Sequence, residues 1–91
     1  LYEMVVCDTL ARHWRLREPT RFLTGTDEHG DKVARAAAEN GVTPRAFVDR
    51  IAGIFRATWD TCGISYDHFV RTTDAEHVRV VQEILARVHA K

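Results

Sequence analysis

Residues 21–32, RFLTGTDEHGDK, decide how the rest of the chain is interpreted. Phe22 and Leu23 near the start predict a short strand over residues 21–24. Residues 25–30 then interrupt the apolar pattern with three ionisable side chains, and apolar residues at helical spacing follow them. In open α/β sheets, ligands bind beyond the carboxyl ends of the strands. The stretch therefore predicts a strand, a turn in a ligand-binding position and a helix.

Helical periodicity extends to both sides of this stretch. Residues 1–17 carry apolar side chains at spacings of three and four, and Pro19 prevents that helix from continuing. After the turn, one helix is expected to run up to Gly41, which suits a left-handed helix end. The next is expected from Thr43, a capping residue followed by proline, to Gly63.

The last third of the chain predicts one more strand and one more helix. Aromatic and branched residues predict a strand over residues 68–71, and residues 73–76 have the spacing of a capping box before a final helix. The order helix, strand, helix, helix, strand, helix is typical of an α/β fold with parallel strands joined by helical crossovers. Two strands are few for such a sheet, and the chain starts and ends within helical patterns, so we expect a segment of a larger domain.

Composition gives little sign of a specialised partner. Thirteen basic and thirteen acidic residues give no net charge, and a hydrophobic share of 45% is ordinary for a soluble protein, so no overall field attracts nucleic acid. Four arginines crowd the first fifth of the chain among acidic residues, and we interpret them as a solvated helix face, with an RNA-binding patch as the alternative. They are Arg12, Arg15, Arg17 and Arg21. No apolar run is long enough to cross a membrane, and we expect a cytoplasmic protein.

The remaining conspicuous residues indicate structure. Cys7 and Cys62 are too far apart for a CxxC pattern and are interpreted as small core residues, as are the helical-stripe aromatics Trp14 and Trp59. The pairs at i,i+4 spacing, Asp8 with Arg12 and Glu83 with Arg87, are expected to form exposed ion pairs.

The turn carries the candidate chemistry. Asp27 at the strand end presents a carboxylate suited to an ammonium group, and His29 could donate or accept a hydrogen bond nearby. The alternative, equally open on the residues alone, is that Asp27 caps a helix beginning near Glu28. Three adjacent residues rarely point at one ion and no second ligand cluster has suitable spacing, so we expect no metal site. No phosphate-binding glycine motif or nucleophile elbow is present.

Residues 22–32 resemble the strand, turn and helix of bacterial methionyl-tRNA synthetases. The resemblance extends over residues 2–16, 41–59 and 66–73, and so covers essentially the whole chain. Related class I synthetases for leucine, isoleucine, valine and cysteine carry an aspartate at the same strand end, but differ over residues 28–32. The combination here therefore points to methionine. Two departures, Glu18-Pro19 in place of a glycine turn and cysteine in place of the usual alanine at position 7, do not touch Asp27.

The resemblance implies a Rossmann-type class I catalytic domain of which residues 1–91 form a part. It implies an enzyme that joins methionine to tRNA(Met) through an adenylate, with ATP and its Mg²⁺ as a substrate. Asp27 is then expected to bind the α-amino group of methionine, with His29 and Gly30 as supporting walls of the site.

The HIGH-type and KMSKS-type sequences of the family are absent from these residues. The family's zinc-bearing insertion, most of its methionine side-chain pocket and its anticodon-binding domain belong to other segments. We therefore expect no cofactor or metal in this segment, and no activity from it alone. The alternative function is a noncatalytic binding or interaction module derived from the same fold.

Overall fold

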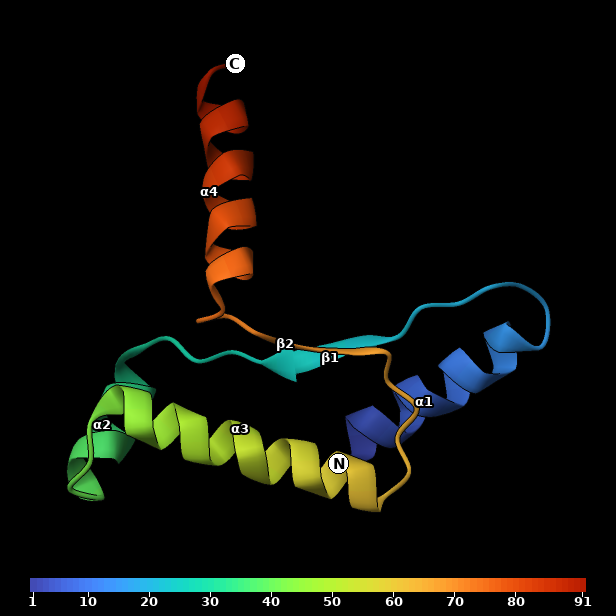
Figure 1. Ribbon diagram of the computed structural model, residues 1–91, viewed down its shortest axis with the longest axis horizontal. Helices are drawn as coiled ribbons and strands as arrows, with labels where there is room; N and C mark the ends of the chain where they lie inside the picture. Colours follow the sequence, from blue (N-terminus) through green and yellow to red (C-terminus); the bar gives the residue numbers. More distant parts are fainter.

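The computed structural model describes residues 1–91, and its elements follow the predicted order. They are α1 (Tyr2–Arg15), β1 (Leu23–Thr26), α2 (Asp31–Glu39), α3 (Pro44–Thr61), β2 (His68–Arg71) and α4 (Ala75–His89). Figure 1 shows α1 and α3 on one side of the two strands, whereas α4 projects away from the opposite side. The α/β class expected from the sequence is confirmed.

The two strands form one parallel sheet, in which Leu23 lies opposite His68 and Thr26 lies opposite Arg71. Helices α2 and α3 make the crossover between them, as predicted. The first strand begins and ends two residues later than predicted. It continues through Gly25 because a glycine there lets β2 approach closely: a Cβ at this position would lie 1.8 Å from the carbonyl oxygen of Val70.

The signals for the ends of α2 and α3 are confirmed. The chain after α2 turns at Gly41 with φ of 67°, a conformation that suits glycine. The hydroxyl of Thr43 accepts a hydrogen bond from the amide of Ala46 at 3.2 Å, so it caps α3.

The predicted capping box at residues 73–76 is wrong. The N-cap residue of α4 is Asp74, and no side chain caps this helix. The carboxylate of Asp74 instead accepts from the amide of Arg71 at 3.0 Å, and the hydroxyl of Thr73 donates to Glu28 at 2.5 Å. Both side chains are engaged by residues outside the helix, so the local spacing was misleading.

A small core lies between the sheet, α1 and α3, formed by Ala11, Phe22, Ala52, Trp59, Ile64 and Phe69. The burial expected of Trp59 is therefore confirmed. Cys7 and Cys62 are exposed, and Trp14 is 47% exposed, so these three predictions of core residues are wrong. Helix α1 contacts the core through Ala11 and Met4, whereas larger apolar residues such as Val5 and Leu10 stay exposed because no other element among these residues covers them.

The molecule is open in shape. Its radius of gyration is 16.1 Å, whereas a compact chain of this length would have about 12 Å. Only nine of the 91 residues are buried, and α4 contributes none of them. Most of the apolar surface of α1 and α4 is thus available to further structure. None of the helices has the length and apolar character required to span a membrane.

Three of the four N-terminal arginines, Arg12, Arg17 and Arg21, are exposed, as the predicted solvated face requires, whereas Arg15 is half-buried. Arg15 donates to the carbonyl oxygen of Ser65 at 2.8 Å and to the carboxylate of Asp67 at 2.9 Å. Arg12 forms the predicted pair with Asp8 and also donates to the carbonyl oxygen of Gly63 at 2.7 Å. These bonds fasten α1 to the segment that leads into β2. The predicted pair between Glu83 and Arg87 is also present.

Candidate functional site

The candidate site lies where β1 ends. Asp27 directly follows the last residue of β1 and is exposed. Asp27 borders a cavity of about 390 Å³ that lies between the start of α1, the end of β1 and α3. The polar part of the lining includes Thr24, Thr26 and Glu3, and the apolar part includes Met4, Val33, Phe47, Ile51 and Trp59. A carboxylate at the rim of a partly apolar cavity is a suitable arrangement for a small amphipathic ligand.

The Asp27 carboxylate has almost no partner within the protein. Its one hydrogen bond is a long one, 3.4 Å from the amide of His29, and it forms no ion pair. The alternative, in which Asp27 caps a helix, is wrong. Helix α2 begins at Asp31, its N-cap residue is Gly30, and no side chain caps it. The lone pairs of Asp27 therefore remain available to a cation.

The neighbouring carboxylate of Glu28 is in the opposite situation. Its side chain is 2% exposed, and it accepts hydrogen bonds from Thr26 at 2.8 Å, Thr73 at 2.5 Å and the Nε of Arg71 at 2.9 Å. Burial opposes its charge, but the hydrogen bonds from Arg71, Thr73 and Thr26 outweigh that cost and hold the pKa of Glu28 below its ordinary value. Glu28 is thus an ionised structural group with no capacity left for a ligand.

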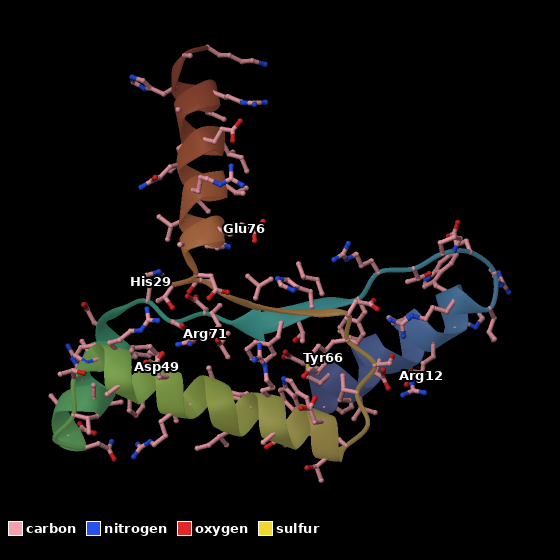
Figure 2. The ribbon with its side chains drawn as sticks, viewed as in Figure 1. Arg12, His29, Asp49, Tyr66, Arg71 and Glu76 are labelled. Carbon is pink, nitrogen blue, oxygen red and sulfur yellow. The ribbon has the colours of Figure 1, made fainter.

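Arg71, at the end of β2, joins this turn to α3. Beyond Glu28 it donates through Nη2 to the carboxylate of Asp49 at 2.5 Å, and Figure 2 shows its side chain between the end of the sheet and Asp49 on α3. The hydrogen bond from Arg71 lowers the pKa of Asp49, and the bonds to Glu28 and Asp49 raise the pKa of Arg71. The sequence interpretation missed Glu28, Arg71 and Asp49. One signal was available, since Arg71 ends the predicted second strand at the same edge of the sheet as the turn.

His29 and Gly30 complete the turn. The Nε2 of His29 lies 3.3 Å from the carbonyl oxygen of Thr72, and the backbone amide of Glu28 donates to the hydroxyl of the same threonine at 2.8 Å. Gly30 has φ of 110°, which strains any residue with a Cβ. Asp27, His29 and Gly30 thus lie in one turn at the carboxyl end of β1, and their roles toward a ligand stay a prediction. No group of three or more His, Cys, Asp or Glu side chains is arranged to hold a metal ion.

Comparison with known proteins identifies the family. A family model described as "tRNA synthetases class I (M)" matches residues 1–91. The chain belongs to the class I methionyl-tRNA synthetase family. Among curated members of that family, the methionine–tRNA ligase of Deinococcus radiodurans is 48% identical over 92 residues, covering 98% of this chain. The methionine–tRNA ligase of Caldanaerobacter subterraneus subsp. tengcongensis is 47% identical over 89 residues, covering 97% of it.

A solved methionyl-tRNA synthetase has the same fold over this region. The Mycobacterium tuberculosis enzyme, in a crystal structure bound by methionyl-adenylate, superposes with a TM-score of 0.94 and 47% identity over 98% of this chain. The fold described above is therefore that of a portion of the synthetase catalytic domain. The chain spans 13% and 14% of the two curated relatives and 18% of the M. tuberculosis chain.

Proposed function

We propose that this chain is part of a methionine–tRNA ligase, which uses ATP with Mg²⁺ to activate methionine and transfers the methionyl group to tRNA(Met). Family membership over all 91 residues supports this, as does the likeness to a methionyl-tRNA synthetase that binds methionyl-adenylate. In the activating reaction, a carboxylate oxygen of methionine attacks the α-phosphorus of ATP, and pyrophosphate leaves. The second reaction transfers the methionyl group to tRNA and releases AMP.

The contribution of this segment is to bind the α-ammonium group of methionine through Asp27. The contrast between two adjacent carboxylates carries this assignment: Glu28 is buried and fully paired, whereas Asp27 is exposed at a cavity rim and lacks any cationic partner. A charge-assisted hydrogen bond between ammonium and carboxylate would also fix the direction in which the substrate carboxylate points. Holding that group at the attack position supplies proximity and orientation, a large part of the available rate enhancement.

His29 and Gly30 are proposed as supporting walls. His29 lies against the carbonyl oxygen of Thr72, which ties its ring to the end of β2. Gly30 allows the chain to turn away from the site into α2. The groups that neutralise the phosphates of ATP are assigned to the HIGH-type and KMSKS-type sequences, which these residues do not contain.

The test of the proposed function is methionine-dependent ATP–pyrophosphate exchange by the full-length protein that carries this chain. We expect exchange with methionine. At equal concentration, the rate of exchange with leucine, isoleucine, valine or cysteine should be at least a hundredfold lower, because a site complementary to the methionine side chain discriminates against the others. A full-length protein without HIGH-type and KMSKS-type sequences, or purified protein that gives no exchange with methionine, would favour a noncatalytic interaction module instead.

A polypeptide of these 91 residues alone is expected to be inactive in exchange and marginally stable. Seventeen large hydrophobic side chains are exposed and only nine residues are buried, so little apolar area offsets the conformational entropy lost on folding. Thermal unfolding followed by circular dichroism should give a broad, weakly cooperative transition. A sharp transition at high temperature from a monomer would contradict this expectation.

A further inference from the structure

The turn that carries Asp27 is held from one side by the segment that ends β2. Thr72 accepts the amide proton of Glu28 at 2.8 Å, and its own amide donates to the carbonyl oxygen of Thr26 at 3.2 Å. Thr73 and Arg71 both donate to the carboxylate of Glu28. The residues on both sides of Asp27 are therefore fixed by a segment more than 40 positions away in the sequence.

The Asp27 side chain contributes little to its own placement. Its carboxylate has one backbone contact at 3.4 Å, which is too long to orient the side chain firmly. Its backbone position is set instead by its two neighbours. Thr26 belongs to the sheet, and Glu28 belongs to a polar cluster with Arg71, Thr73 and Asp49. Any change that shifts Glu28 should shift Asp27 with it.

Arg71 is the one cation that anchors this cluster. Its Nε lies 3.1 and 2.9 Å from the two oxygens of Glu28, and its Nη2 lies 2.5 Å from Asp49. The guanidinium fork thus bonds the turn and α3 at the same time, with its side chain only 20% exposed. A lysine ammonium is a single point charge at the end of a flexible chain and cannot reproduce the two directions of this fork.

We propose that Arg71 is a positioning residue for the amino-acid substrate: through Glu28 and Asp49 it fixes the turn that carries Asp27. The inference rests on the proposed role of Asp27 and extends it to residues that touch no substrate. A displaced Asp27 carboxylate would make a longer and weaker charge-assisted hydrogen bond to the substrate ammonium group, so the loss should fall on the binding of methionine. A change at Arg71 should therefore weaken the binding of methionine through its ammonium group and leave the binding of ATP unchanged.

The test is Arg71→Lys in the full-length protein, measured by ATP–pyrophosphate exchange. We expect the KM for methionine to rise roughly tenfold, while the KM for ATP and kcat stay within about twofold. The specific readout is inhibition by 4-(methylthio)butanoate, which is methionine without its α-amino group. Its inhibition constant should not change, because it has no ammonium group for Asp27 to hold.

Two further variants complete the design. Thr73→Val removes one hydrogen bond to Glu28 and keeps the shape of the side chain, so it should give the same pattern at about threefold, and it remains informative when Arg71→Lys is insoluble. Arg87→Lys, in an exposed pair on α4, is the matched control and should behave like the wild type.

The outcomes separate the two proposals. An unchanged KM for methionine in both cluster variants would overturn the positioning role, and so would an equal loss for methionine and its deaminated analogue, which indicates general disturbance of the site. Asp27→Asn is measured in parallel. If Asp27→Asn binds methionine normally, the proposed function of Asp27 fails. If Asp27→Asn binds methionine weakly but Arg71→Lys and Thr73→Val bind it normally, only the role of Arg71 fails.

Discussion

Replacing Asp27 with asparagine in the full-length protein is expected to raise the KM for methionine by roughly a hundredfold or more in ATP–pyrophosphate exchange. Asparagine has almost the same shape, so the exposed turn should keep its conformation. The change removes the negative charge and can point an amide donor at the ammonium group, and truncating one member of a bonded charge pair typically costs about 2–5 kcal/mol. The KM for ATP should change far less, since Asp27 is assigned to the amino acid alone.

The matched control for this variant is Asp31→Asn. Asp31 is exposed in the first turn of α2, four residues after Asp27, and it forms no ion pair. It therefore tests the loss of one local negative charge without loss of the proposed ligand contact, and a KM for methionine within about twofold of wild type is expected. Equal KM values for the two variants would show that Asp27 has no special role.

Replacing Gly25 with alanine is expected to lower the free energy of unfolding by about 3 kcal/mol or more, a large effect for one methyl group. The added Cβ would lie 1.8 Å from the carbonyl oxygen of Val70, and both atoms belong to the backbone, so no side chain can rotate away. The strands must separate, and the hydrogen bonds between them must lengthen. The midpoint of urea unfolding of the full-length protein, followed by circular dichroism, measures the change.

Gly53→Ala is the control for that experiment. Gly53 lies within α3, and a Cβ there would have no atom within 4 Å. Alanine is the better helix former, so this variant should be neutral or more stable by about 0.5–1 kcal/mol. A loss of stability in Gly53→Ala as large as that in Gly25→Ala would contradict the assignment of the effect to strand separation.

The fold could be predicted as far as its signals are local. Thr43 with Pro44 and the left-handed Gly41 lie at the ends of α3 and α2, and each acts through atoms a few residues away. The bounds of β1 could not be predicted, because hydrogen bonding to β2 decides which residues join the sheet. How far α1 is buried could not be predicted for a related reason: a helical stripe such as Val5 and Leu10 shows which face is apolar, but not whether another element covers it.

The candidate site divides in the same way. Asp27 could be singled out because a carboxylate in a turn after a strand is visible in the sequence, although its binding role stays a prediction. The buried cluster behind it could not, since Glu28 and Arg71 are 43 positions apart and meet only through the register that places Thr26 opposite Arg71. Nothing in the composition of the turn distinguishes Glu28, whose carboxylate is paired within the fold, from Asp27, whose carboxylate remains available to a ligand.

The parallel pairing of the strands also sets an order of events during synthesis. Phe22 and Asp67, hydrogen-bonded beside the sheet, are 45 positions apart, so the turn that carries Asp27 is translated well before the segment that holds it. At roughly 5–20 residues per second, that interval is about 2–9 s. Helices α2 and α3 can form from local contacts within it, whereas the turn must wait for β2. The conformation of the turn that carries Asp27 is thus completed only when residues 68–73 are available to the folding chain.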